Sequence, residues 1–238
     1  MVTLLLRLAG PLQSWGVGSK FETRTTSKAP SKSGVLGMVA SAMGRDREDS
    51  LDDLASLKFG VRIDQEGTIL KDFHTAHSAS RKTAYVTNRH YLENGCFLVG
   101  LEGDETLLFR IEDAIKNPFY PLYLGRRSCP PTGRMILGFR DKVLYEALRD
   151  EPWLASEWYR KRTPSNVMLE IVCEDDSDLF SESVRDVPLS FSQTRRKHGF
   201  RNVRRVLDGK TIENSDSGIK KPMNAQFDPM FEVKKEVR

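Results

Sequence analysis

The apolar segment at the start of the chain, from Thr3 to Ala9, limits the possible folds most strongly. It contains four leucines and one charged residue, Arg7, and it is followed by Gly10 and Pro11, which favour a turn. The segment is far shorter than the roughly 18 to 20 apolar residues of a membrane span. No basic residue precedes the apolar run and Arg7 interrupts it, which argues against a signal peptide. We therefore expect a buried central strand that ends in a turn.

The composition is that of a folded protein. Of its 238 residues, 39% are hydrophobic and 29% are charged, whereas a disordered chain would have far fewer apolar residues. Its three cysteines, Cys96, Cys129 and Cys173, are widely spaced and form no C-x-x-C pair, which argues against both a disulfide framework and a zinc site. We expect a cytoplasmic protein with one main domain and an extension, and no cofactor or metal.

Hydrophobic periodicity predicts an α+β fold. A helix is expected from the N-cap Ser33 to Met43, with Gly44 as its C-terminal stop, and a second helix from Glu105 to Lys116. The expected strands of the first half are residues 3–9, 58–64, 69–74, 96–101 and 120–124. This β-α-β-β-α-β order, with an insertion before residue 96, is that of a ferredoxin-like or RNA-recognition-motif fold.

The second half predicts a smaller β-rich part. Its expected strands are residues 167–173, 187–192 and 199–206, and a polar, charged tail follows them. We therefore expect a main domain over residues 1–140, a smaller β-rich C-terminal lobe over residues 141–210, and a tail over residues 211–238.

Charge is unevenly distributed, although the net charge is only +4 and the pI is about 8.9. No acidic residue occurs between Val187 and Leu207. The basic residues that crowd together there are Arg195, Arg196, Lys197, Arg201, Arg204 and Arg205. We expect a basic surface separate from the acidic residues at 174–178, and a solvated basic loop is the alternative.

Three segments carry side chains suited to RNA, and the first follows the first strand. Gln13 and Trp15 lie there between Gly10 and Gly16, which let the backbone approach a ligand. Trp15 is a candidate platform for base stacking. Alternatively, Trp15 packs beneath the long loop that follows it.

The second segment is a rigid cationic loop at residues 125–131. Arg126 and Arg127 follow a glycine and precede Ser128 and a Pro-Pro pair. Guanidinium groups bind phosphate oxygens, and Ser128 adds a hydroxyl donor. In the alternative, both arginines pair with carboxylates on the protein surface.

The third segment, residues 74–91, interleaves aromatic, basic and small polar residues and contains no carboxylate. Its candidate RNA contacts are Arg81, Tyr85 and Arg89. We predict a protruding hairpin whose aromatic rings stack on bases while its cations contact phosphates. A hairpin packed back on its own sheet is the alternative.

A metal-independent ribonuclease is a second functional hypothesis. The residues that could form its site are His74, His77, His90 and His198 as acid or base, with Tyr85, Lys82 or Lys197 completing it. No spacing fixes a nucleophile, a base and an oxyanion donor together. The sequence also has no Walker loop, no H-E-x-x-H, no G-x-S-x-G and no paired-carboxylate metal motif.

Five blocks of the sequence share the order and spacing of a known family. They are R-L-A-G-P-L-Q-S-W-G at residues 7–16, P-S-K-S-G-V-L-G at 30–37, D-F-H-T at 72–75, R-H-Y-L at 89–92 and Y-L-G-R-R-S-C-P at 123–130. Together they resemble the CasD family, the type I-E branch of the CRISPR Cas-five proteins. The resemblance is clear over about the first 140 residues, fainter at residues 186–188 and 195–203, and absent from residue 210 onward.

The resemblance implies a Cascade subunit with a ferredoxin-like or RNA-recognition-motif fold and a thumb hairpin, here at about residues 74–92. Its body would bind the 5′ handle of the CRISPR RNA and cap the backbone filament, in contact with the backbone and large subunits. Its thumb would displace a nucleotide beside the handle. In this branch another subunit cleaves RNA, whereas the related type I-C protein cuts RNA itself.

We therefore expect a non-catalytic, handle-binding subunit of a Cascade antiviral complex that holds target DNA when assembled and does not contact a membrane. The expected RNA contacts are Gln13, Trp15, Arg24, Lys32, Ser33, Arg126, Arg127 and Ser128 in the body, and Arg81, Tyr85 and Arg89 in the thumb. The alternatives are an endoribonuclease that processes CRISPR repeat RNA and a ferredoxin-like adaptor between proteins.

Overall fold

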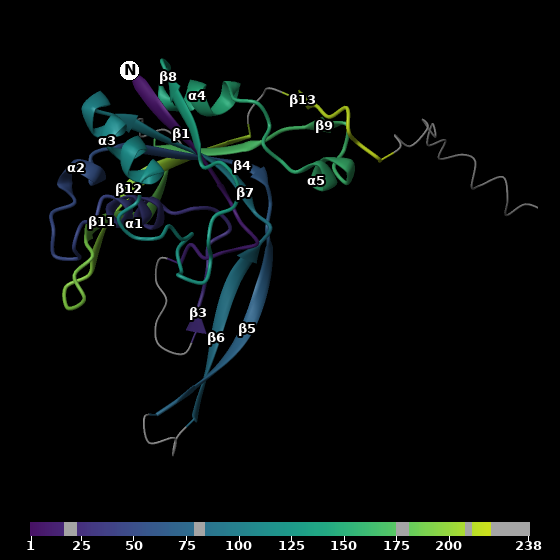
Figure 1. Cartoon of the computed structure of the whole chain (residues 1–238). Coiled ribbons are helices and arrows are strands. Elements are labelled where there is room, and N and C mark those ends of the chain that lie inside the picture. Colours follow the sequence, from purple (N-terminus) through teal and green to yellow (C-terminus); the bar gives the residue numbers. More distant parts are fainter. Residues whose placement is uncertain (17–22, 79–83, 175–180, 208–210, 220–238) are drawn as a thin grey trace, which may run out of the picture.

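The main feature of the computed structural model is a seven-stranded sheet (Figure 1). The structure describes residues 1–16, 23–78, 84–174, 181–207 and 211–219. The strand order is β11-β12-β10-β4-β7-β1-β8, and neighbouring strands are antiparallel. The strands are β1 (Val2–Ala9), β4 (Lys58–Gln65), β7 (Cys96–Gly103), β8 (Ile136–Arg140), β10 (Glu170–Glu174), β11 (Glu182–Ser190) and β12 (Lys197–Leu207). The expected mixture of helices and strands is confirmed.

Strand β1 lies between β7 and β8 and is buried on both faces, as the apolar segment predicted. Leu4, Leu6 and Leu8 join the core that includes residues of helices α1 (Lys32–Ala42), α2 (Asp52–Ala55) and α3 (Glu105–Lys116). Leu5 points to the other face, where it joins a second cluster with residues of α4 (Leu144–Asp150). Because strand side chains alternate, a strand of this composition needs apolar cover on both sides, and these helices provide it.

The helix boundaries follow local capping groups. Helix α3 has the predicted bounds, and its N-cap Asp104 accepts a hydrogen bond from the backbone N–H of Leu107 at 2.8 Å. The expected N-cap of α1, Ser33, is wrong. Ser31 is the N-cap because it is extended and its hydroxyl accepts from the N–H of Gly34, which leaves Ser33 buried in the first turn.

The expected strand at residues 120–124 is also wrong. This segment is irregular, and the edge of the sheet is formed by β8, which begins at Ile136. Pro118 and Pro121 give a physical reason, since proline has no backbone N–H to donate to a ladder.

A long hairpin stands away from the main sheet, and we call it the thumb (Figure 1). Its strands β5 (Thr68–His77) and β6 (Ala84–Glu93) pair in register from Thr68 opposite Glu93 to His77 opposite Ala84. Two short strands, β2 (Leu12–Gln13) and β3 (Thr23–Arg24), pair with the other edge of β6. The thumb therefore grows out of a separate four-stranded sheet and is not packed back on the main one.

A buried arginine fixes the chain that leaves α4. Arg62 on β4 is 1% exposed and forms a two-pronged ion pair with Asp64, with both nitrogen–oxygen distances at 2.8 Å. Its remaining donors bind the carbonyl groups of Leu148, Glu151 and Pro152. Burial raises the pKa of Asp64, and the hydrogen bonds and positive charge of Arg62 oppose that shift. The chain then forms α5 (Glu157–Lys161) and β9 (Asn166–Val167), which pairs with β13 (Ile212–Glu213).

The strands of the C-terminal half extend the main sheet. Strand β10 pairs with β4 on one side and with β12 on the other, so β10, β12 and β11 continue the order begun by the first half. The limits of a C-terminal lobe remain a prediction. Within the described ranges, no helix is long and apolar enough to cross a membrane.

A buried network of charges joins these strands to helix α1. Asp186 on β11 pairs with Arg201 on β12 and also accepts a hydrogen bond from the backbone N–H of Lys32 at 2.8 Å. The ammonium group of Lys32 binds Glu174 on β10 at 2.9 Å. The side chains of Lys32, Asp186 and Arg201 are less than a tenth exposed. One carboxylate therefore holds the N-terminus of a helix and two strands at once.

We predict that Asp186→Asn lowers the free energy of unfolding by about 3–5 kcal/mol, because it removes the nearer charged partner of the buried Arg201 guanidinium and leaves only Glu174, at 3.6 Å and already paired with Lys32. Denaturant unfolding of the full chain measures the change. Asp150→Asn is the control: Asp150 pairs with Lys142 and Arg149 on the exposed side of α4, where loss of a pair costs about 0–1 kcal/mol. Equal effects of the two substitutions would contradict the prediction.

Candidate nucleic-acid interface

The two faces of the thumb carry different side chains. Residues opposite each other in an antiparallel pair share a face, and neighbours along a strand alternate between faces. The register of β5 and β6 therefore places His74, Tyr85 and Arg89 on one face and Phe73 and Val86 on the other. The first face carries basic and aromatic side chains and one carboxylate, Asp72, which lies opposite Arg89 in the register, and we call it the Tyr85 face. Tyr85 is 61% exposed, so its ring is accessible to a ligand.

The Tyr85 face continues into a cluster at the base of the thumb. The guanidinium of Arg126 lies over the ring of Tyr91, with 4.6 Å between its central carbon and the ring centroid. Arg126 also donates hydrogen bonds of 3.1 Å to the carbonyl groups of His90 and Arg24. These contacts bind the cationic loop to β6 and β3.

The pKa of the Tyr91 hydroxyl reports the positive surroundings of this cluster. Burial alone would raise that pKa, but hydrogen bonds from Ser128 and Arg126, the charge of Arg126 and a hydrogen bond from Arg89 together lower it. Three predicted RNA contacts, Arg89, Arg126 and Ser128, thus meet around Tyr91, and Arg24 is joined to them through its carbonyl, which accepts from Arg126. Sequence reasoning missed Tyr91, although its position two residues after Arg89 places it on the same face of β6.

Three consecutive residues of β6 have buried polar atoms that lack a hydrogen-bond partner within the described part of the chain. They are Asn88 through its Oδ1, Arg89 through its Nε and His90 through its Nδ1. Buried polar atoms are usually paired, so such a group calls for an explanation. Arg89 lies on the Tyr85 face and Asn88 and His90 lie on the opposite face, so a ligand on the Tyr85 face would supply a partner for Arg89 alone.

The cationic loop is held by a close backbone approach. Gly125 has a φ of +88°, and a Cβ atom on it would lie 1.7 Å from the carbonyl oxygen of Ser14. The N–H of Ser14 donates to the carbonyl of Leu124 at 3.0 Å. Glycine is therefore required where the two predicted body loops meet. Beyond it, Arg127 and Ser128 are exposed.

Gln13 and Trp15 lie inside the protein. Trp15 is 1% exposed, and its indole N–H donates to Oε1 of Gln13 at 2.9 Å. The amide nitrogen of Gln13 donates to the carbonyl of Gly95 at 2.6 Å. A Cβ atom on Gly34 would lie 2.9 Å from the Trp15 ring, so the ring packs directly on helix α1. This is the packed position that the sequence left open as the alternative to base stacking.

The remaining predicted contacts include both buried and exposed side chains. Lys32 and Ser33 are buried at the start of α1, and Lys32 is paired with Glu174. Arg24 is exposed on β3. Arg81 lies outside the described residues.

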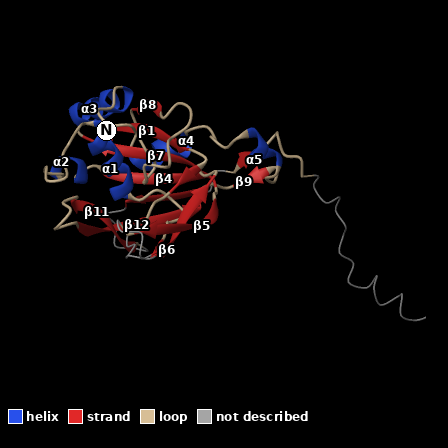
Figure 2. Ribbon diagram, turned by 60° about the horizontal axis from the view of Figure 1, so that its bottom comes forward, coloured by secondary structure: helices blue, strands red, loops and turns tan. Residues whose placement is uncertain are grey.

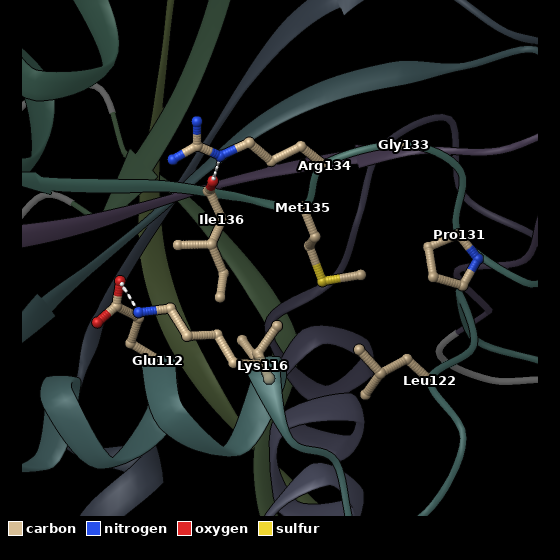
Figure 3. Close-up of a pocket in the computed structure, with 9 residues that line it drawn as sticks. Glu112, Lys116, Leu122, Pro131, Gly133, Arg134, Met135 and Ile136 are labelled. Carbon is tan, nitrogen blue, oxygen red and sulfur yellow. Dashed lines mark hydrogen bonds and ion pairs between the residues drawn. The ribbon is translucent and has the colours of Figure 1, made fainter.

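A hollow of about 400 Å³ between α3 and β8 lies next to the interface (Figure 3). Its lining includes Leu122, Met135 and Ile136, and the Nε of Arg134 donates to the carbonyl of Ile136 at 2.7 Å. The ion pair of Glu112 and Lys116 borders it. Its walls combine apolar side chains with the charged residues Glu112, Lys116 and Arg134, and none of the predicted RNA contacts lines it.

We predict that Arg126 and Arg127 differ in their roles. Arg127→Ala should lower the slope of log affinity against log salt for single-stranded RNA by about 0.7, the value of one phosphate contact, without changing the melting temperature. Arg126→Ala should lower the melting temperature, because charged hydrogen bonds of this kind contribute about 1.5–3 kcal/mol. Fluorescence titrations at several salt concentrations and thermal melts measure both. An unchanged slope in Arg127→Ala would contradict the assignment.

Comparisons with known proteins agree with this architecture. A family model described as "CRISPR-associated protein (Cas_Cas5)" matches residues 3–204. The "CRISPR system Cascade subunit CasD" of Escherichia coli (strain K12) is 38% identical over 157 residues, which cover 57% of this chain and 70% of that protein. The resemblance found in the five sequence blocks is therefore confirmed.

Two solved structures have the same fold. "Crystal structure of Cas protein" is 36% identical, covers 92% of this chain and 100% of that chain, and has a TM-score of 0.68. A chain of "CRISPR RNA-guided surveillance complex" is 34% identical, covers 86% of this chain and 89% of its own, and has a TM-score of 0.71. Since the family model spans most of the sequence, the chain belongs to the Cas5 family of CRISPR-associated proteins.

Proposed function

We propose that the chain is a non-catalytic subunit of a type I-E Cascade antiviral complex and binds the 5′ handle of its CRISPR RNA. The observation that carries this proposal is the Tyr85 face, which joins the Tyr91–Arg126 cluster in one basic and aromatic surface. An exposed ring such as Tyr85 beside cations suits single-stranded nucleic acid, because every base can stack and every nucleotide has a phosphate. Similarity to a protein named as a Cascade subunit supports the same assignment.

We describe the central part of the fold as ferredoxin-like. The chain order β1-α1-β4-β7-α3-β8 and the spatial order β4-β7-β1-β8 support this description. The thumb is then the insertion between β4 and β7. In this arrangement the central sheet carries the handle-binding loops, and the hairpin extends beyond them.

The RNA contacts are assigned to the accessible members of the predicted set. Direct contacts are Arg24, Tyr85, Arg89, Arg127 and Ser128, Arg126 holds the cationic loop in place for them, and Arg81 remains a proposed thumb contact. Gln13, Trp15, Lys32 and Ser33 act indirectly, because buried side chains cannot reach RNA while the fold is intact. They hold the loop and helix on which the surface is built.

In the assembled complex, the chain caps the backbone filament and contacts the large subunit. The thumb displaces a nucleotide where the handle meets the guide, so an effect on target DNA follows through guide geometry. These roles rest on the resemblance to Cascade subunits.

The positions of the histidines favour a non-catalytic role over an endoribonuclease. His74 lies on the Tyr85 face, whereas the register places His90 on the opposite face, together with His77. His77 and His90 are six residue pairs apart along the hairpin, about 20 Å at 3.4 Å per residue. His198 belongs to β12 of the main sheet. Acid–base catalysis needs groups within hydrogen-bond reach of one proton, and this arrangement separates them.

Incubation of the full chain with labelled CRISPR repeat RNA in the presence of EDTA tests the proposal. We expect an intact, retarded RNA band.

We also predict that replacing all four histidines by asparagine leaves the guide RNA of the assembled complex at the same mature length. A cleaved band from the unmodified chain that disappears in this variant would establish the nuclease instead, and the absence of any bound band would favour a protein adaptor.

Tyr85→Ala should weaken target-DNA binding by the assembled complex, because stacking of one base contributes roughly 1–3 kcal/mol. The melting temperature of the subunit should stay unchanged, since the ring is largely exposed. Phe73→Ala is the matched control, an exposed ring on the opposite face of the same hairpin. Equal target binding by both variants would contradict a stacking role for Tyr85.

A further inference from the structure

The hairpin of β11 and β12 forms a second basic projection at the edge of the main sheet. It contains the run without acidic residues between Val187 and Leu207. Figure 1 shows its turn pointing to the same side of the molecule as the thumb, and Figure 2 brings both hairpins to the front. The two projections lie on one side, although they belong to different sheets.

The cations of this hairpin divide into two groups. Near the body, Arg201 pairs with Asp186, and Arg205 pairs with Glu170 and Glu182. At the turn, Arg195, Arg196 and Lys197 are exposed and form no ion pair with any described residue. Many other exposed cations of the chain have a carboxylate partner, for example Lys116, Lys142 and Lys161. The turn is therefore a concentration of unneutralised positive charge.

Aromatic rings lie beside these cations. Phe200 on β12 is 68% exposed, and the guanidinium of Arg185 on β11 lies 5.8 Å from its ring centroid. The guanidinium of Arg196 lies 6.0 Å from the ring of Phe191. A Cβ atom on Gly37 would lie 3.3 Å from the Phe191 ring, so this second ring is anchored on helix α1. The hairpin turn is thus positioned by packing and offers one exposed ring.

The pKa of His198 reflects the same surroundings. Burial lowers it first, the positive charges of Arg196 and Arg185 lower it further, and Asp186 opposes them. Residue 198 lies between the turn and Phe200 on β12, so the positive potential extends along the hairpin.

We propose that this hairpin is a second binding surface for single-stranded nucleic acid, separate from the thumb and its base. Arg195, Arg196 and Lys197 bind backbone phosphates, and Phe200 with Arg185 stacks on a base. The proposal goes beyond handle binding, because it rests on other residues and another sheet. A strand held at the thumb would have a second attachment point on the same side of the protein.

An acidic protein surface is a weaker match for this hairpin. Protein interfaces also use aromatic rings and arginines, so the choice rests on the turn cations, which lack carboxylate partners among the described residues and suit phosphates. Rings interleaved with phosphate-binding cations are the usual composition of sequence-independent single-strand binding. Guide RNA and displaced DNA share this chemistry, so the experiment uses both.

The test measures binding of the full chain to a labelled 20-nucleotide oligouridine and to oligodeoxythymidine of equal length at several salt concentrations. The first variant is Arg195→Gln with Arg196→Gln and Lys197→Gln. Loss of three phosphate contacts should lower the log–log salt slope by about 2, at roughly 0.7 per contact. Phe200→Ala should weaken binding by about 5- to 150-fold, the equivalent of one lost stacking interaction.

The matched control is Lys116→Gln with Lys142→Gln and Lys161→Gln, which removes the same net charge from exposed ion pairs elsewhere. It should leave the slope within about 0.3 of the unmodified chain, because no phosphate contact is lost. Melting temperatures of all variants should agree, since the substituted side chains are exposed. Tyr85→Ala, measured alongside, separates this surface from the thumb.

A reduced slope with both probes, or with RNA or DNA alone, supports the proposal, and the affected probe identifies the source of the strand. Unchanged binding of both probes by the turn variant and by Phe200→Ala overturns it. Equal losses in the turn variant and the lysine control also overturn it, because net charge alone would then explain the effect. If the hairpin variants lose binding and Tyr85→Ala does not, the binding measured here belongs to the hairpin surface, and the thumb role is tested separately by target-DNA binding of the assembled complex.

Discussion

The carboxylate of Asp186 is the interaction on which the arrangement of the two halves depends. It pairs with Arg201 and accepts the backbone N–H of Lys32, while the Lys32 ammonium pairs with Glu174. A helix N-terminus favours a negative charge, and a buried guanidinium requires one, so one group satisfies two needs. The network joins α1 to β10, β11 and β12. It thereby fixes the β11–β12 hairpin against helix α1.

Two arginines that are adjacent in the sequence have different structural roles. Arg126 uses its planar group to join the cationic loop to β6 and β3 and to cover Tyr91, whereas Arg127 is exposed beside it. The same division occurs on β12, where Arg201 is buried in an ion pair and the turn cations are exposed. Cations of the first kind build a surface, and cations of the second kind are available to phosphates.

The sequence predicted elements whose signal is local. The apolar runs of β1 and β7, the capped periodicity of α3 and the alternation in β4 each depend on residues within one segment, and all were found near their true bounds. The edge strand was predicted at residues 120–124, which are as apolar as β8 but contain Pro121. The true edge strand, β8, was missed because it is short and only partly buried. The N-cap of α1 was misplaced because Ser31 and Ser33 are chemically equivalent until the backbone conformation is known.

The sequence by itself determined that a basic and aromatic hairpin follows a sheet strand, that a Gly-Arg-Arg-Ser loop lies beyond it, and which family the blocks resemble. The tertiary structure decided which of these side chains reach a ligand. Trp15 and Lys32 have the right chemistry for RNA, but the close approach of Gly34 and the carboxylate of Glu174 place them in the interior. Tyr91 joined the interface because β6 brings it beneath Arg126. Exposure depends on contacts between residues far apart in the chain, and local composition does not contain that information.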